Sequence, residues 1–291
     1  MNKVLELYGI STRSDGEVDW ASVLIQQFCP YLGRKCAKNR KSNPDVTIGT
    51  CSVEYGRERK QIMICPYRFL ERNQVFLDCI HLLTLHEPGN ELHIVPEVGI
   101  PGGNVDYFLV SALNGQVKDF VGVELQTIDT TGTVWPERQR FLDDRGVKVN
   151  ANDVASSRKF GMNWKMTSKT ILVQLHHKVE TLEGINKHLV LVAQEHLFDY
   201  MRREFQFEHI KNARLGDSMH FHTYRFAQSN KGNFRTSLDS RYSTDADGIA
   251  ISLGLSISPK VELKKIIAIL EEKISDKTLI QFQERQSRTR E

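Results

Sequence analysis

Three acidic residues and a glutamine stand between positions 97 and 126 at spacings that suit a divalent-cation site. Asp106 lies in the apolar run 105–110, Glu124 and Gln126 lie in the run 120–126, and Glu97 precedes both. Mg²⁺ prefers oxygen ligands, and near a phosphodiester it polarises a phosphoryl oxygen and generates a hydroxide. The pattern therefore predicts phosphodiester hydrolysis, with Asp106 and Glu124 as ligands of Mg²⁺. Gln126 would position the attacking water without supplying positive charge. Glu97 would complete the ligand set of a second ion or act as a base.

Both runs are rich in β-branched and aromatic residues and are separated by Asn114-Gly115, which predicts an antiparallel hairpin. The register decides which side chains share a face of the sheet. A two-residue loop would pair Asp106 with Val123 and send Glu124 to the opposite face. A three-residue loop would pair Asp106 with Gly122, which would leave open space for a cation and put both acids on one face. We therefore expect the three-residue loop.

Acidic residues on a strand are often only a solvated face, and that interpretation stays open for Asp106. Glu124 differs because it sits inside an apolar run, where a carboxylate without a partner would be costly. The sequence shows no glycine-rich phosphate cradle, nucleophile elbow or dinucleotide fingerprint, so we expect no organic cofactor.

Four cysteines form a second constellation before position 66. Four thiolates gathered tetrahedrally suit zinc or iron, although no C-x-x-C pair is present and disulfides or plain buried thiols remain alternatives. The odd count of five cysteines and the apparent lack of a signal peptide argue against disulfides and favour a reducing cytoplasm. Cys79 lies in a later apolar run and could replace one of the four. The four cysteines of this constellation are Cys29, Cys36, Cys51 and Cys65.

The segment that holds these cysteines is basic. Ten lysines and arginines face four acidic residues there, a balance of +6, so a whole-chain charge of +3 leaves −3 for the rest. Basic surfaces bind DNA phosphates, and an arginine side chain can donate two hydrogen bonds to a guanine base. The alternative is that these basic residues form only a solvated surface. More arginines lie in 127–163, which we expect to be a long loop, and in 211–242. The candidate DNA contacts are Arg34, Lys35, Arg138, Arg140, Arg145 and Arg225.

Together these motifs resemble a known family. The chain between residues 28 and 200 is similar to the NotI family of type II restriction endonucleases. The segments that carry the resemblance are Phe28-Cys29-Pro30, Gly49-Thr50-Cys51-Ser52-Val53, Cys65-Pro66-Tyr67-Arg68-Phe69, Pro96-Glu97, Val105-Asp106-Tyr107 and Val123-Glu124-Leu125-Gln126.

The resemblance implies a PD-(D/E)XK core with glutamine in its last position, a four-cysteine iron site, and a homodimer that cuts a G/C-rich palindrome. It implies that the four cysteines before position 66 bind the iron and that Asp106 and Glu124 bind the catalytic ion. Gln126 and Glu97 would be supporting residues. Two features depart from the family pattern, the compact length of 291 residues and the extra thiol of Cys79.

The length suits one catalytic domain and a small appended module, and the sequence has no 18-residue apolar run. We expect an α/β fold, with a mixed sheet flanked by helices in a PD-(D/E)XK core at 73–291, and a helix with the four-cysteine metal-binding module at 1–72. His220 and His222 alternate on an expected strand, on a face that we assign to solvent, with a phosphate or base contact beside Arg225 as the alternative. Helices are expected at 18–28, 74–85, 164–180, 196–208 and 261–274, strands at 188–194 and 247–255, and a frayed tail from 281.

We therefore predict a restriction endonuclease that hydrolyses double-stranded DNA at a palindromic site with Mg²⁺ in the prokaryotic cytoplasm. A homodimer is expected because two-fold protein symmetry matches a two-fold DNA site. The alternative is a noncatalytic, metal-stapled DNA-binding regulator whose Asp106 and Glu124 are surface charges. Neither prediction involves a membrane, and Mg²⁺-dependent cleavage separates the two.

Overall fold

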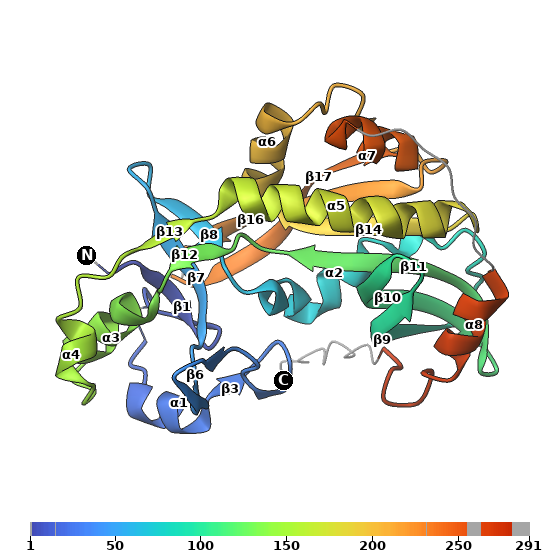
Figure 1. Ribbon diagram of the computed structural model, residues 1–291. Coiled ribbons are helices and arrows are strands. Elements are labelled where there is room, and N and C mark those ends of the chain that lie inside the picture. Colours follow the sequence, from blue (N-terminus) through green and yellow to red (C-terminus); the bar gives the residue numbers. More distant parts are fainter. Residues whose placement is uncertain (1, 15, 231, 255–262, 281–291) are drawn as a thin grey trace.

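A seven-stranded mixed sheet forms the centre of the protein, as seen in a computed structural model that describes residues 2–14, 16–230, 232–254 and 263–280 (Figure 1). Its strand order is β15-β17-β16-β14-β11-β10-β9. β14 runs parallel to β11 and β16, and the other neighbouring strands of this sheet are antiparallel. The strands are β9 (Glu91–Ile100), β10 (Gly103–Leu113), β11 (Gln116–Gln126), β14 (His188–Gln194), β15 (Lys211–Asn212), β16 (Met219–Gln228) and β17 (Phe234–Thr244).

The N-terminal part contains a four-stranded sheet of order β2-β1-β7-β8 and two short ladders, β3-β4 and β5-β6. A further ladder, β12-β13, follows the central hairpin along the chain. These strands are β1 (Val4–Leu7), β2 (Ile10–Ser11), β3 (Phe28–Cys29), β4 (Arg34–Lys35), β5 (Asn39–Arg40), β6 (Asn43–Thr47), β7 (Thr50–Tyr55), β8 (Lys60–Met63), β12 (Thr130–Gly132) and β13 (Phe160–Met162).

Helices cover both faces of the central sheet. The long helix α5 packs on β10 and β14, and the short helices η1 and α2 lie under the opposite face (Figure 1). The helices are α1 (Trp20–Gln26), η1 (Pro66–Asn73), α2 (Gln74–Leu77), η2 (Ile80–Leu82), α3 (Trp135–Asp144), α4 (Ala151–Val154), α5 (Trp164–Glu183), α6 (Glu195–Glu204), α7 (Ala246–Leu253) and α8 (Leu263–Glu271).

The expected mixed sheet flanked by helices is confirmed. Its two faces carry separate apolar clusters, because alternate residues of each strand point to opposite sides. Phe108 and Leu191 pack under α5, whereas Val121 and Val190 pack against η1 and α2. Leu5 from β1 joins this second cluster, so the apolar core crosses the boundary that we predicted at residue 72. The division of the chain there stays a prediction.

Arg68 links the N-terminal sheet to the central one. Its side chain is 1% exposed, and its Nε donates to both carboxylate oxygens of Glu6 on β1 at 3.0 Å. Nη1 reaches Glu71 at 2.8 Å, and Nη2 donates to the carbonyl of Phe234 on β17 at 3.0 Å. The guanidinium also lies over the ring of Tyr31, 4.9 Å from its centroid. This single side chain therefore fastens β1, η1 and β17 together.

Three expected segments differ from the structure. The run 247–255, expected as a strand, is α7: the Asp245 carboxylate accepts from the Gly248 N–H at 2.8 Å, and Gly254 ends the helix at φ 75°. The expected helix 74–85 is broken into α2 and η2. The expected long loop 127–163 contains α3, α4 and two strands.

Other expected elements lie where the sequence places them. Helices α1, α5 and α6 and strand β14 match the expected segments within a few residues. Of the expected helix 261–274, the structure describes α8, and the expected tail from 281 lies outside the described residues. His220 and His222 are 1% and 0% exposed, so their assignment to a solvent face is wrong. That face of β16 is covered by the helices around Cys79 and Leu82, which the sequence pattern of one strand does not reveal.

The hairpin between β10 and β11 closes with two residues rather than the expected three. Leu113 pairs with Gln116, which leaves Asn114 and Gly115 as the loop. Both have positive φ, 53° and 75°, as a type I′ turn requires.

A β-bulge then changes the register. The extra residue is Lys118 on β11, and beyond it Tyr107 pairs with Val123. Continued by one residue, this register sets Asp106 opposite Glu124. The two acids share a face as expected, although through a bulge and not through a longer loop.

Gly122 pairs with Phe108, not with Asp106. A Cβ on Gly122 would lie 2.9 Å from Leu189 and 3.2 Å from Leu182, so the space above it is filled by apolar side chains. The expectation of an open space at Gly122 is therefore wrong, and the glycine serves close packing beneath α5.

Candidate active site

Three carboxylates lie in a row across three neighbouring strands. β9 pairs with β10 so that Val98 faces Val105 and Pro96 faces Tyr107, which sets Glu97 across from Asp106. The hairpin register sets Glu124 on the other side of Asp106. The structure therefore brings together the three acids that the sequence singled out.

The central two acids are held in place from different directions. Asp106 is half-buried, and its Oδ2 accepts the backbone N–H of Leu125 at 2.9 Å. Glu124 is 4% exposed and accepts from the Lys178 ammonium through Oε1 at 2.7 Å. Glu97 is exposed and has the left-handed φ of 54°, a strained conformation for a residue with a side chain. The row thus runs from a buried, paired carboxylate to a solvent-accessible one.

Lys178 is a site residue that our sequence reasoning missed. It comes from α5 and is 6% exposed, so its ammonium is buried with Glu124. A signal was present, because Leu175, Lys178 and Leu182 recur at the spacing of one helix face and put the lysine on the apolar side. Its ammonium supplies positive charge that Gln126 cannot.

The turn between β9 and β10 determines how closely α5 approaches the carboxylates. Gly102 has φ 95°, and a Cβ there would lie 2.4 Å from the carbonyl oxygen of His177. Thr181, one turn further along α5, donates its hydroxyl to the carbonyl of Pro101 at 2.6 Å. Only glycine permits this contact, and it positions Lys178 over the sheet.

The charges of the site act on one another. The pKa of Glu124 is raised to about 7, chiefly by burial and then by the charge of Asp106, while Lys178 opposes both effects. Burial also raises the pKa of Asp106, and the charge of Glu97 adds to that rise while Lys178 opposes it. Crowded carboxylates that repel each other favour a bound cation, which neutralises them together.

Gln126 follows Glu124 on the same face of β11 and is half-buried. Its amide nitrogen donates to the carbonyl of Thr127 at 2.6 Å, which leaves the side-chain oxygen available to a ligand or water.

The four cysteines expected as metal ligands are all buried and free of disulfides. The charges of Cys65 and Cys29 raise the pKa of Cys51, and those of Cys36 and Cys29 raise the pKa of Cys65, in both cases after the larger effect of burial. The four thiols are thus close enough to interact electrostatically. Among the described residues, no three of them bring their sulfurs within 4.8 Å of one another.

Backbone N–H groups point at three of these sulfurs. Burial raises the pKa of Cys29, while hydrogen bonds from the backbone of Leu32 and Tyr31 lower it. The backbone of Gly9 acts in the same way on the pKa of Cys51, and that of Tyr67 on the pKa of Cys65. Such donors stabilise a thiolate, the form that binds metals. Cys79 lies apart, with its Sγ against the carbonyl of Val75 at 3.1 Å and near His222.

Most of the arginines expected to contact DNA are engaged within the protein. Arg138 is 3% exposed and donates to Gln139 and Tyr8. Arg140 donates to the carbonyls of Val154 and Ser156. Further contacts join Arg145 to the carbonyl of Thr12, Arg225 to Asp239, and Lys35 to the carbonyl of Asp45.

Arg34 is placed differently. It is exposed on β4, and its positive charge lowers the pKa of Tyr67 and of Tyr107, against the larger opposing effect of burial. The charges of Glu97 and Asp106 also raise the pKa of Tyr67. Arg34 therefore lies on the side of the protein where the carboxylates lie.

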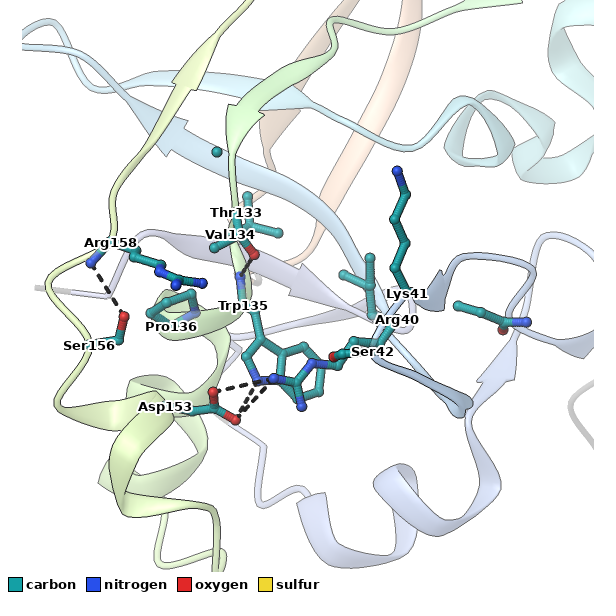
Figure 2. Close-up of a pocket in the computed structure, with 13 residues that line it drawn as sticks. Arg40, Lys41, Ser42, Thr133, Val134, Trp135, Pro136, Asp153, Ser156 and Arg158 are labelled. Carbon is teal, nitrogen blue, oxygen red and sulfur yellow. Dashed lines mark hydrogen bonds and ion pairs between the residues drawn. The ribbon is translucent and has the colours of Figure 1, made fainter.

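A cavity of about 460 Å³ lies between β5 and helices α3 and α4 (Figure 2). The guanidinium groups of Arg40 and Arg138 lie over the Trp135 ring, 4.3 and 4.4 Å from its centroid, and Asp153 accepts from the Trp135 indole at 2.8 Å. Lys41 also lines the cavity and points away from Asp153. The cavity is separate from the carboxylate row.

In the part of the chain that the structure describes, no helix is long and apolar enough to cross a membrane.

Comparison with known proteins agrees with the resemblance noted from the motifs. A family model described as restriction endonuclease NotI matches residues 25–236, which include the cysteine segment, the row of carboxylates and Lys178. A search of curated proteins found no match. The match covers well over half of the chain. The chain therefore belongs to the NotI restriction endonuclease family, and it is a type II restriction endonuclease, a site-specific deoxyribonuclease that acts on double-stranded DNA.

Proposed function

We propose that Glu97, Asp106, Glu124 and Lys178 form the active site and that the enzyme cleaves DNA with Mg²⁺. The observation that carries the proposal is the buried pair of Lys178 and Glu124, beside Asp106. Asp106 and Glu124 would hold Mg²⁺, which supplies Lewis-acid stabilisation of the phosphoryl group and a water of lowered pKa. The oxygen-rich donor set fits such a hard cation.

The side chains around the ion would divide the remaining work. Lys178 would hold positive charge near the phosphate oxygens, the role that a glutamine at position 126 leaves unfilled. Gln126 would orient the attacking water through its amide oxygen. Glu97, exposed at the end of the row, would accept a proton from that water or bind a second ion.

We infer that the catalytic fold is a PD-(D/E)XK core. The support is topological: the antiparallel strands β9, β10 and β11 carry the acids, and α5 leads into β14, which is parallel to β11. The Lys178 ammonium comes from the crossover helix α5 and not from strand β11 itself.

We also propose that Cys29, Cys36, Cys51 and Cys65 bind one structural iron or zinc ion. Burial of all four thiols, their mutual electrostatic influence and the N–H groups aimed at three sulfurs fit a thiolate donor set. A bound ion would contribute folding energy to a segment of short strands.

The DNA would lie along the side of Arg34 and the carboxylates. Arg34, and Lys41 at the cavity of Figure 2, are suitable to contact phosphates, because neither is held by an ion pair among the described residues. A homodimer would cut both strands of a palindrome, and the family suggests a G/C-rich one. A restriction enzyme of this kind would act in a prokaryotic cytoplasm.

The test is digestion of a long mixed-sequence DNA with Mg²⁺ or Ca²⁺, using wild type, Asp106→Asn, Glu124→Gln and the control Glu91→Gln. Glu91 is an exposed acid on β9 outside the row. Wild type and control should give the same discrete Mg²⁺-dependent fragments, and the two site variants should bind in Ca²⁺ without cutting. Fragment ends that map to an asymmetric sequence would refute the palindrome. Cutting by either site variant would refute the site, and DNA binding without cleavage by wild type would favour the regulator that we weighed as an alternative.

A further inference from the structure

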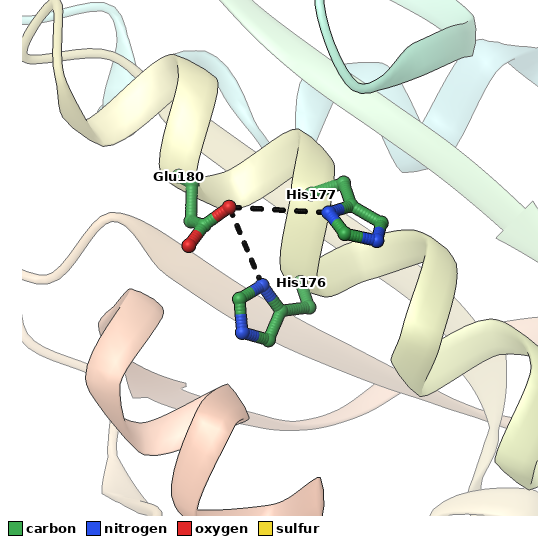
Figure 3. A group of neighbouring side chains, drawn as sticks. All are labelled: His176, His177 and Glu180. Atoms are coloured by element: carbon green, nitrogen blue, oxygen red, sulfur yellow. Dashed lines mark ion pairs between the residues drawn. The ribbon is translucent and has the colours of Figure 1, made fainter. Parts of the chain in front are cut away.

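Helix α5 carries a second cluster of potential ligands, on the turn that holds Lys178 (Figure 3). Oε2 of Glu180 lies 3.5 Å from Nδ1 of His176 and 4.0 Å from Nδ1 of His177. All three ligand atoms lie within 4.8 Å of one another, and among the residues that the structure describes this is the one such group of His, Cys, Asp or Glu. Metal–ligand bonds of about 2.1 Å in a tetrahedron separate ligands by roughly 3.4 Å, so small side-chain rotations would complete the site.

The burial of His176 gives an independent reason to expect a ligand. Its side chain is largely buried, with 7% of the residue exposed, yet its Nδ1 has no hydrogen-bond partner. A buried polar atom left without a partner is costly, and a bound cation would satisfy it. Figure 3 shows the Nδ1 atoms of His176 and His177 directed toward the same carboxylate oxygen of Glu180. His177 is 63% exposed, which leaves a path by which an ion can enter from solvent.

We propose that His176, His177 and Glu180 bind a transition-metal ion of the Zn²⁺ class. Two imidazoles and one carboxylate suit zinc and its neighbours, whereas Mg²⁺ and Ca²⁺ prefer oxygen ligands throughout. Three protein ligands leave a fourth position for water. The site is distinct from the carboxylate row and from the cysteines.

A bound ion would stabilise the turn of α5 that packs against the β9–β10 turn. The carbonyl of His177 is the atom that packs against Gly102, and the Thr181 hydroxyl donates to both the His177 carbonyl and Pro101. Cross-linking the ligands would hold this turn, and with it the backbone of Lys178, in the observed conformation. The metal site itself does not depend on the proposed function.

The test counts zinc per chain after equilibrium dialysis of the purified protein against Zn²⁺, together with the melting temperature. His177→Gln and Glu180→Gln each remove one ligand at an accessible position. The control His196→Gln removes an imidazole 3.5 Å from the Glu195 carboxylate, which has no third ligand within 4.8 Å in the described ranges. Any metal at the cysteines is the same in every sample and therefore cancels in the comparison.

We expect wild type and control to bind one zinc more than the two variants, whose affinity should fall at least about tenfold with the loss of one of three protein ligands. Added zinc should raise the melting temperature of wild type and control only. With Co²⁺ in place of zinc, the spectrum of wild type minus that of either variant should show ligand-field absorption and no thiolate charge-transfer band, because any Co²⁺ at the cysteines contributes equally to both spectra. An equal zinc content in all four proteins would overturn the proposal, whatever their nuclease activity.

Discussion

Replacement of Arg68 by methionine should destabilise the whole protein. The guanidinium is 1% exposed and satisfies the Glu6 carboxylate, which is 2% exposed. Removing one partner of a buried ion pair leaves an uncompensated charge and costs about 3–5 kcal/mol of unfolding free energy. For a chain of this size that corresponds to a fall in melting temperature of about 10 °C.

The loss should depend on pH. Burial raises the pKa of Glu6 and Arg68 lowers it, so without Arg68 the folded-state pKa rises further. A carboxyl group whose pKa is raised on folding loses stability as pH increases from its unfolded pKa to its folded pKa. Arg68→Met should therefore be less damaging at pH 5 than at pH 8.

Denaturant unfolding at both pH values, with metal content verified, measures the effect. Arg59→Met is the matched control, because Arg59 pairs with Glu54 at 2.8 Å but its side chain is 53% exposed, and it should cost less than about 1 kcal/mol. Arg68→Met combined with Glu6→Gln should recover much of the loss, since no buried charge remains. A loss equal to that of the control, or a double variant no better than the single one, would refute this reasoning.

Three other experiments test the active site and the cysteine segment. Lys178→Met should lower the cleavage rate about 10²–10³-fold while DNA binding in Ca²⁺ persists, as measured by single-turnover digestion, and an unchanged rate would exclude the ammonium from catalysis. Gly102→Ala should lower the free energy of unfolding by more than about 2 kcal/mol, because its Cβ would lie 2.4 Å from a backbone oxygen. The control Gly115→Ala should lower it by only about 1 kcal/mol, because its Cβ would meet open space and only the φ of 75° is strained. Cys36→Ser should lose the structural metal in elemental analysis and Cys79→Ser should retain it, and equal metal content in both would remove Cys36 from the ligand set.

The parts of the fold that follow local patterns could be predicted from the sequence. Alternating apolar residues and Asn114-Gly115 define the central hairpin, and the spacing of the acids predicts the row of carboxylates that the structure brings together. The bulge at Lys118 could not be predicted, since the register depends on tertiary packing. The run that forms α7 is rich in isoleucine and resembles a strand, although Asp245 and Gly254 already marked the ends of a helix.

Lys178 was missed for a different reason. Its partner Glu124 lies 54 residues earlier in the chain, and no local pattern joins the two. A lysine among the leucines of an amphipathic helix indicates a buried charge, but only the docking of α5 on the sheet shows which acid it meets. The arginines of α3 illustrate the converse: they look free in the sequence, and packing engages them.

The carboxylates and the Lys178 ammonium of the site come from segments that the ribosome synthesises at different times. β10 and β11 leave the ribosome before α5, so a nascent or truncated chain that ends before residue 164 has the carboxylates without the ammonium. If Lys178 is needed for cleavage, the nuclease acquires activity only when α5 has docked. For an enzyme able to cut the chromosome of its own cell, this order would keep incomplete chains harmless.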